Sequence, residues 1–304
     1  MNAFVIVATK GRAQECYALL DYLAAQSLRP SGVVFVGVDD NDIDGLSAHP
    51  AFSDLGGIVL TTGKPGLTIQ RNFGVSHVLT DMTPSPDWFV AFFDDDFRPS
   101  PTWLENASKV FAAETEVAGL TGQVLADGIH SEGLSETAAA EIVDGGIVTQ
   151  KCWAQGDEPR VVSSMYGCNM AVRGVVFVEA RFDERLPLYG WQEDRDFTSS
   201  VQKYGRTIYH PDPLGVHLGV KSARTSGTRM GYSQIANIIY LKRKGSVSYG
   251  VCAEFLSRAI AANLLKSFRN HPNIDYPGRL RGNFLAFADA IRGKMKPERI
   301  LSIA

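Results

Sequence analysis

An α/β fold, with a doubly wound sheet and a helical extension at the C-terminus, is what this sequence predicts. Short apolar runs rich in β-branched and aromatic residues alternate with amphipathic segments through the first half of the chain. Polar or glycine-containing turns separate them, which is the order of βα units. From about residue 230 onward, apolar residues recur at helical spacing without strand-like runs.

The first half contains four apolar runs that predict strands, at residues 4–8, 33–38, 57–60 and 88–93. The intervening segments predict helices, at residues 15–25, 69–79 and 102–113. Thr68 is expected to cap the second helix. In the second half we expect strands at 119–125 and 145–148, and a loop or surface helix at 132–141. In a sheet built from such units, ligands bind at the carboxyl ends of the strands.

The composition disfavours several classes of protein. The chain has 304 residues, of which 45% are hydrophobic and 21% charged, as in a soluble globular protein. The formal net charge of −3 argues against nucleic acid as the main partner. No stretch approaches the roughly 20 apolar residues of a membrane-spanning helix, and the first residues show no signal peptide. Four cysteines without a C-x-x-C pair indicate reduced thiols in the cytoplasm.

The most informative feature is the triplet Asp94-Asp95-Asp96, which directly follows the apolar run 88–93. Three adjacent carboxylates repel one another strongly unless a cation neutralises them. Oxygen ligands suit Mg²⁺ or Mn²⁺, and such an ion keeps open positions for substrate phosphates. The alternative is a solvated acidic turn. Because the triplet follows a buried strand at the ligand-binding end of the sheet, we predict a divalent metal site.

Five ordered motifs, spread over roughly residues 3–220, resemble those of the GT-A glycosyltransferases, particularly family two. They are Val5-Ile6-Val7-Ala8-Thr9, Val38-Asp39-Asp40, Thr68-Ile69-Gln70-Arg71-Asn72, Asp94-Asp95-Asp96 and Trp191-Gln192-Glu193-Asp194. The resemblance implies a GT-A catalytic domain at residues 1–229, with a nucleotide-binding half (1–122) and an acceptor half (123–229). A helical C-terminal extension is expected at 230–304.

The resemblance implies an inverting, metal-dependent enzyme. Such an enzyme moves a sugar from a nucleoside diphosphate, here expected to be UDP, to a glycan or lipid-linked acceptor in bacterial surface-polysaccharide biosynthesis. The glutamine-rich processive motif of the family's membrane synthases is absent, which favours transfer of one or a few sugars. The donor sugar, the linkage and the oligomeric state stay open.

The family pattern of aspartate, any residue, aspartate falls on Asp94 and Asp96. It implies Asp96 as the direct metal ligand and places Asp94 and Asp95 on the substrate side. His217 is expected as a second ligand, because several family members supply a histidine at a comparable point; imidazole would favour Mn²⁺ over Mg²⁺. The alternative for a lone histidine on a strand is a core or surface position.

The donor side is expected at Thr9, Arg12, Asp39, Arg71 and Asn72. Asp39 resembles the family's aspartate that accepts a hydrogen bond from the uracil ring, with a turn residue that satisfies its own backbone as the alternative. Arg71 lies in the first turn of its helix, where free N–H groups favour an anion and a guanidinium can bind a diphosphate. A surface ion pair is its alternative.

The acceptor side is expected around Glu193 and Asp194, since the family's matching acidic pair supplies the catalytic base from its second member. That base takes the proton of the acceptor hydroxyl; acids that stabilise a helix N-terminus are the alternative. Tyr189 and Trp191 are expected to stack on sugar rings. Asn169 lies in a segment similar to the family's acceptor-side segment.

Two basic segments lie toward the C-terminus. Residues 221–229 suit a mobile lid over a diphosphate, or else a plain basic loop. Residues 284–301 form a basic amphipathic pattern that predicts peripheral contact with an anionic membrane, with packing on the protein itself as the alternative.

Two alternative functions remain from the sequence. A sugar-phosphate nucleotidyltransferase shares the sheet and the metal-binding acids, but the turn at residues 9–12 is a poor version of its glycine-rich loop. A non-catalytic scaffold that binds a glycan or a nucleotide is the other.

Overall fold

The computed structural model describes the chain except residues 83, 151, 223–224, 270, 272–273 and 304. The strands are β1 (Asn2–Ala8), β2 (Gly32–Gly37), β3 (Gly57–Thr61), β4 (Trp88–Asp94), β5 (Phe97–Pro99), β6 (Val117–Asp127), β7 (Arg160–Val161), β8 (Asn169–Arg173) and β9 (Arg206–His217). The α-helices are α1 (Ala13–Ala24), α2 (Leu67–Asp81), α3 (Trp103–Ala113), α4 (Glu136–Gly145), α5 (Glu193–Val201), α6 (Gly227–Lys244), α7 (Tyr249–Lys266) and α8 (Tyr276–Ile291).

One mixed sheet contains all of these strands, in the order β3-β2-β1-β4-β8-β6-β9-β5, with β7 paired to β9. The first four strands along this order are parallel, β8 runs antiparallel to β4 and β6, and β9 runs parallel to β6. The predicted doubly wound mixed sheet is therefore confirmed, and the four strands predicted in the first half are present.

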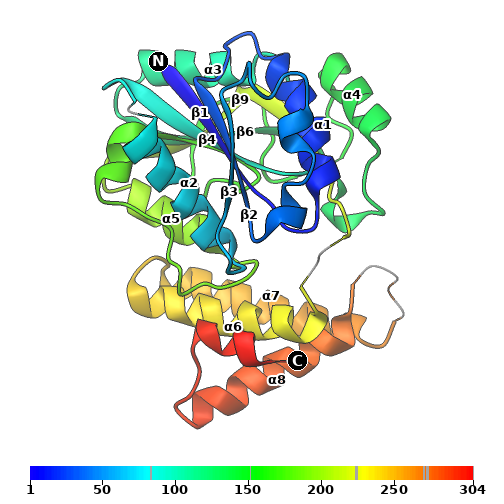
Figure 1. Ribbon diagram of the computed structural model, residues 1–304. Helices are drawn as coiled ribbons and strands as arrows, with labels where there is room; N and C mark the ends of the chain where they lie inside the picture. The colour runs from blue at the N-terminus through cyan, green and yellow to red at the C-terminus, as the bar shows by residue number, and fades with distance from the viewer. Residues whose placement is uncertain (83, 151, 223–224, 270, 272–273, 304) are drawn as a thin grey trace.

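Helices cover both faces of the sheet because successive strand residues point to opposite sides. In β1, Val5 and Val7 belong to one hydrophobic core with residues of α1 and α3, whereas Phe4 and Ile6 belong to another with residues of α2 and α5. Gly74 lets α2 approach closely, since a Cβ there would lie 2.7 Å from a methyl group of Ile6. Figure 1 shows α1 and α2 on either side of the central strands.

Two local predictions are wrong, and one further segment is divided between two elements. Residues 145–148 are not a strand: Gly145 ends α4, and Gly146 caps it with a φ of 60°. Thr68 does not cap α2, because the N-cap residue of this helix is Gly66. The Thr68 hydroxyl instead donates to the carbonyl of Leu186 at 3.2 Å. The amphipathic pattern at 284–301 is not one helix, since α8 ends at Ile291 and a 3₁₀ turn, η5, follows at Pro297–Ser302.

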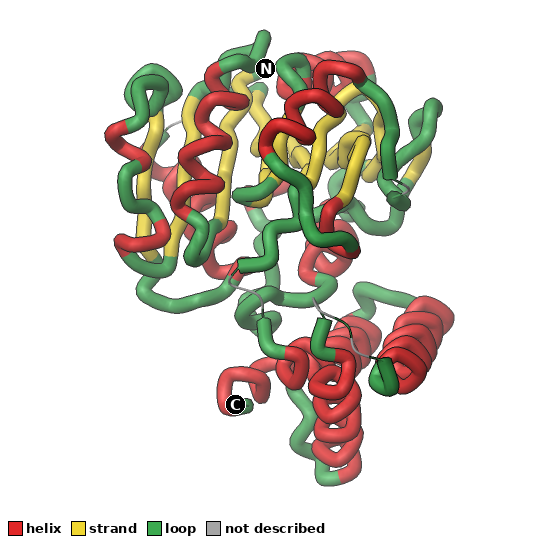
Figure 2. Tube along the Cα trace, turned by 90° about the vertical axis from the view of Figure 1, so that its right-hand side faces the viewer, coloured by secondary structure: helices red, strands yellow, loops and turns green. Residues whose placement is uncertain are grey.

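Helices α6, α7 and α8 form a separate group beside the sheet (Figures 1 and 2). Tyr232, Ile235 and Ala286 belong to their own buried core. The crossing of α6 and α8 is tight, because a Cβ on Gly231 or Gly282 would collide with backbone oxygen of the opposite helix. No helix within the described residues has the length and apolar character needed to cross a membrane.

Candidate active site

The carboxyl ends of β1, β2 and β4 meet at one edge of the sheet, because these strands are parallel neighbours. Thr9 directly follows β1, Asp39 lies two residues after β2, and Asp94 is the last residue of β4, with Asp95 and Asp96 next in the chain. Gln70 of α2 fastens this edge: its side-chain amide donates to the carbonyls of Thr9 and Val36, each at 2.7 Å. No motif in the sequence predicted this role of Gln70.

The three acids of the triplet have different partners. The side chain of Asp94 keeps 29% of its surface exposed. Asp95 and Asp96 are buried. Asp95 accepts from the hydroxyl of Thr9 at 2.8 Å and from Arg12 at 2.9 Å. The buried Asp96 accepts from the backbone N–H of Val220 at 2.8 Å.

Asp94, Asp96 and His217 form a group that can hold a metal ion, each offering a ligand atom within 4.8 Å of the others. Nε2 of His217 lies 3.2 Å from Asp96, and its Nδ1 lies 3.0 Å from Asp127. A carboxylate behind a histidine fixes the tautomer and orientation that a metal ligand needs. Two carboxylates and an oriented imidazole therefore fit Mn²⁺ or Mg²⁺.

The negative charges of the carboxylates in this group require a compensating positive charge. Burial alone would raise the pKa of Asp96, but the charge and hydrogen bond of His217, with Arg12, hold that pKa well below its usual range. Burial by itself would lower the pKa of His217, but Asp96 and Asp127 raise it well above normal. Burial raises the pKa of Asp95 to about 7 against the attraction of Arg12. The positive charge is either a proton on His217 or a metal ion that replaces it.

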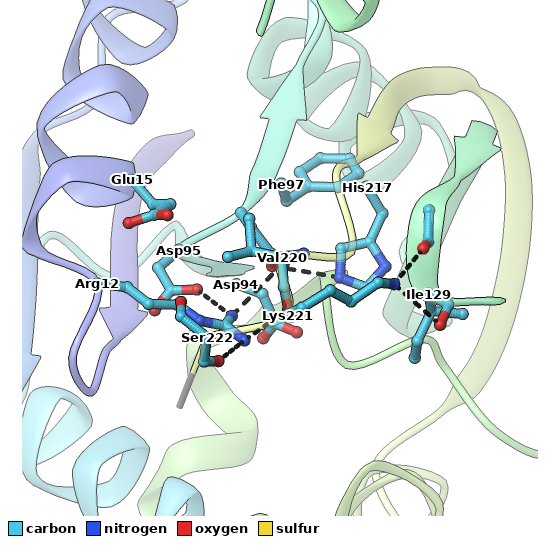
Figure 3. A network of polar contacts seen from close by, with 12 residues as sticks. Arg12, Glu15, Asp94, Asp95, Phe97, Ile129, His217, Val220, Lys221 and Ser222 are labelled. Atoms are coloured by element: carbon cyan, nitrogen blue, oxygen red, sulfur yellow. Dashed lines mark hydrogen bonds and ion pairs between the residues drawn. The ribbon is translucent and has the colours of Figure 1, made fainter. Parts of the chain in front are cut away.

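Arg12 ties the segment after β9 to the triplet. Its guanidinium donates to the carbonyls of Val220 and Ser222, each at 3.0 Å, as well as to Asp95 (Figure 3). Lys221 donates to the carbonyl of Gly128 at 2.7 Å. The predicted lid at 221–229 thus starts at the site; its residues 223 and 224 lie outside the described part of the chain, and its role stays a prediction.

The nucleotide-side residues differ in how accessible they are. Asp39 is exposed, and its Oδ1 accepts from the backbone and side-chain N–H groups of Asn41 at 3.0 and 3.1 Å, so it stabilises the local turn. Thr9 has 2% of its surface exposed, and its hydroxyl donates to Asp95. Asp42, which the sequence analysis did not single out, is buried and accepts from the N–H of Gly11 at 2.6 Å.

Arg71 is buried and joins the two acidic groups of the site. Its guanidinium donates to Asp94 at 3.0 Å, to Glu193 at 2.8 Å and to the carbonyl of Gly167 at 2.8 Å. With 1% of its surface exposed, it offers no free face to a diphosphate here. Arg71 therefore connects the triplet to Glu193, the residue beside the predicted base Asp194.

The two predicted asparagines are also turned inward. Asn72 exchanges hydrogen bonds with the backbone of Phe182 and donates to Glu184, each at 2.9 Å. Asn169 is fully buried, and its Oδ1 accepts from the Trp103 indole at 3.0 Å. Both hold elements together in this structure and have little or no surface through which to touch a substrate.

Glu193 and Asp194 open α5 in different environments. Glu193 is buried, pairs with Arg71 through Oε1, and leaves its buried Oε2 without a partner among the described residues. Burial raises its pKa to about 8. Asp194 is only partly buried and accepts from the N–H groups of Arg195 at 2.7 Å and Gly167 at 3.4 Å. Burial raises its pKa as well.

The segment before α5 has an unusual backbone. Leu188 and Gln192 have φ angles of 59° and 70°, in the left-handed region that side chains disfavour, and Gly190 between them has 64°. Strain of this kind concentrates at functional sites. It presents Tyr189 with half of its surface exposed, whereas Trp191 packs edge-on against Phe255 of α7 at 5.7 Å.

Comparisons with known proteins agree with this geometry. The family model described as Glycosyl transferase family 2 matches residues 4–140. Crystal structures of TarS residues 1–349 from S. aureus are similar, at 16% identity: one has a TM-score of 0.60 and covers all of this chain and 83% of that one. Another, in complex with UDP-GlcNAc, has a TM-score of 0.54 and covers 100% and 84%.

A mannosyltransferase from Pyrobaculum calidifontis, in complex with GDP-Man and Mn²⁺, is also similar, with a TM-score of 0.55, 14% identity and coverage of 96% and 86%. The chain has the GT-A fold of glycosyltransferases. The family-model match within this fold supports a glycosyltransferase. No curated protein matches the sequence significantly.

Proposed function

We propose that the protein is an inverting glycosyltransferase that passes a sugar from a nucleoside diphosphate to an acceptor hydroxyl. The observation that carries the proposal is the bridge that Arg71 forms. Its guanidinium binds both Asp94 of the triplet and Glu193, which directly precedes the proposed base Asp194. Donor-side and acceptor-side carboxylates, far apart in the chain, thereby lie in one hydrogen-bonded unit.

The proposed cofactor is Mn²⁺ or Mg²⁺, held by Asp94, Asp96 and His217. It would offset the negative charge of the donor's diphosphate. Mn²⁺ is the better fit because of the imidazole ligand, and the similar mannosyltransferase carries Mn²⁺ with its nucleotide sugar. Asp127 holds His217 in the ligand orientation, and Arg12 draws the Asp95 carboxylate toward itself.

Asp194 is the proposed catalytic base. Of the two acids that open α5, it is the less buried, and backbone N–H groups fix its orientation. Its raised pKa improves it as an acceptor of the hydroxyl proton. Attack by that hydroxyl on the face opposite the diphosphate is a single displacement, which inverts the anomeric carbon. Glu193, paired to Arg71, holds the segment in place.

UDP is the proposed nucleotide. The exposed Asp39 at the end of β2 suits the uracil N–H, and two similar TarS structures contain UDP-GlcNAc and UDP. A glycan or lipid-linked acceptor in bacterial surface-polysaccharide biosynthesis, and a cytoplasmic protein that contacts the membrane peripherally, complete the proposal.

Turnover of a panel of nucleotide sugars with Mn²⁺ tests this function against the two alternatives. A glycosyltransferase releases free nucleoside diphosphate, a nucleotidyltransferase consumes or forms pyrophosphate, and a scaffold releases nothing. Free nucleoside diphosphate is the expected product, with UDP sugars ahead of GDP and CDP sugars. Pyrophosphate chemistry, or binding without turnover across the panel, would overturn the proposal.

A further inference from the structure

A cavity of about 420 Å³ opens beside Asp127, on the side of this carboxylate that His217 does not occupy. Its walls include Ser131, Gln150, Cys152, Trp153 and Tyr166. The volume is within the range of small-molecule sites, roughly 300 to 1,000 Å³. In Figure 3, Ile129, another wall residue, lies on one side of His217, and Arg12 and Asp95 lie on the other. The cavity therefore lies on the side of His217 away from Arg12 and Asp95.

Two aromatic rings form one wall of the cavity. The rings of Trp153 and Tyr166 lie 5.5 Å apart with a tilt of 43°. Trp153 keeps 48% of its surface exposed and belongs to none of the hydrophobic cores of the described chain. An indole left half exposed beside a polar cavity is an available stacking surface for a ring with apolar C–H faces.

The loop that carries Trp153 is held in place before any ligand arrives. Gln155 donates to the carbonyl of Val124 at 2.7 Å and accepts from the N–H of Cys152 at 2.9 Å. Arg160 donates to the carbonyl of Trp153 itself at 2.8 Å. A preorganised platform of this kind loses little conformational entropy when it binds a ligand.

The charges of the described wall residues favour a neutral ligand. Among the described residues, the wall includes the acid Asp127 and neither Lys nor Arg. Lys221, close by, donates to the carbonyls of Gly128 at 2.7 Å and Ile129 at 3.3 Å. A phosphate or carboxylate would meet the Asp127 charge without a matching cation from the described wall residues, whereas a polyhydroxylated ring can use the Gln150 amide and the Ser131 hydroxyl.

The cavity is linked to the predicted base through the backbone. Tyr166, whose hydroxyl donates to Asp127 at 2.7 Å, directly precedes Gly167. The N–H of Gly167 donates to Asp194 at 3.4 Å, and its carbonyl accepts from Arg71. One short segment thus contributes both to the aromatic wall of the cavity and to the hydrogen bonds of the predicted base.

We propose that this cavity is a subsite for a neutral sugar ring of the acceptor, with the ring stacked on Trp153. This assignment rests on the proposed transferase function, because it needs an acceptor that carries a sugar. It predicts that the acceptor is a glycan with an uncharged pyranose unit, and that a uronic acid at this position binds less well because of Asp127.

The first experiment measures sugar binding without donor or metal. Saturation-transfer NMR with cellobiose, maltose, chitobiose and a glucuronic acid disaccharide is recorded for the wild type, Trp153→Ala and Trp153→Phe. At least one neutral disaccharide should bind to the wild type, lose its signal in Trp153→Ala and regain most of it in Trp153→Phe. Phe268→Ala, which removes another exposed aromatic ring far along the chain, should leave the signal unchanged.

The second experiment measures kinetics with a nucleotide sugar that the wild type turns over. Trp153→Ala should raise the KM for the acceptor at least 10-fold, while hydrolysis of the donor without acceptor stays within 2-fold of the wild type. An unchanged acceptor KM alongside normal donor hydrolysis would overturn the subsite and leave the transferase standing. Absence of all donor turnover would overturn the transferase, and the NMR arm still decides the subsite: no Trp153-dependent signal from any disaccharide rejects it.

Discussion

The adjacent carboxylates Glu193 and Asp194 differ in burial and in hydrogen-bond partners. Glu193 is buried against Arg71, whereas Asp194 is partly exposed and held by two backbone N–H groups. An acid that must meet an acceptor hydroxyl needs exposure, and an acid that fixes a buried guanidinium needs burial. The pair therefore divides into one base and one positioning residue.

Replacement of Asp194 by Asn tests the base. The amide keeps the size of the side chain but cannot accept the proton, so transfer should fall by about 100-fold or more while donor binding persists. The check is initial-rate kinetics beside calorimetric titration of UDP. NMR of the product from an α-linked donor should show a β-linkage; near-normal transfer or a retained α-linkage would reject this assignment.

Glu193 should make stability depend on pH. Burial raises its folded-state pKa to about 8, above the unfolded value, so the folded state binds the extra proton between these pKa values. The stabilisation is complete below the unfolded pKa and is lost as the pH rises through about 8. Urea unfolding at pH 5 to 8.5 should show the wild type losing stability relative to Glu193→Gln; parallel curves for the two proteins would contradict this.

At the scale of elements, the end of α6 is fastened to α5, the helix that begins with Glu193 and Asp194. Lys244, in the last turn of α6, lies 2.7 Å from both Asp183 and Asp196, and Asp196 is buried in the first turns of α5. Asn237, also on α6, donates to the carbonyl of Trp191 at 3.0 Å. The C-terminal helices thus support the segment that carries Asp194.

Replacement of Lys244 by Ala should destabilise the protein by roughly 1 to 3 kcal/mol, because it leaves the buried Asp196 with Ser246 as its remaining polar side-chain partner among the described residues. The neighbouring exposed Arg243 gives a matched control: Arg243→Ala removes the same charge and should change stability by about 0.5 kcal/mol or less. Chemical denaturation measures both. Equal effects of the two substitutions would show that the loss of positive charge alone matters.

Elements with a strong periodic pattern were predictable, and contacts that need the tertiary fold were not. The strand before the triplet follows from its six consecutive apolar residues, 88–93. Ile147 and Val148 gave a false strand signal, since two β-branched residues beside glycines resemble a strand but remain exposed here. Asp127 carries no local motif, and only the pairing of β6 with β9 brings it to His217.

The same limit applies to Arg71. Its place near the start of α2 suggested an anion site, and only the folded chain brings Glu193 and the carbonyl of Gly167 to its guanidinium. Spacing of residues along the sequence identifies the motif but does not say which face of the helix is covered.

At the scale of the whole molecule, charge is unevenly divided. Residues 227–304 contain 13 Lys and Arg against 4 Asp and Glu, a net charge of +9, whereas residues 1–226 contain 17 against 29, a net charge of −12. Large apolar side chains are exposed in the same C-terminal region, including Leu265, Phe268, Phe284 and Ile291 at 65% or more. A basic surface with exposed apolar side chains suits an anionic membrane.

Vesicle binding tests this charge division. Replacement of Arg292, Lys294 and Lys296 by Gln should weaken binding to anionic vesicles at low salt, because each cation contributes about 1 kcal/mol near such a surface. A control that replaces Lys64, Lys109 and Lys203 by Gln removes the same charge from residues 1–226 and should have little effect. Co-sedimentation in which the wild type stays in the supernatant would favour packing or another partner for these helices.

Mn²⁺-dependent binding of UDP, measured by calorimetry for the wild type and Asp96→Ala, tests the central claim most directly. If Asp94, Asp96 and His217 hold the metal that receives the donor's diphosphate, the wild type should bind UDP more tightly with Mn²⁺ than without it. Asp96→Ala should lose that difference, and circular dichroism checks that the variant is folded, because the substitution also removes the ion-pair partner of His217. Unchanged Mn²⁺-dependent binding by a folded Asp96→Ala would contradict the account.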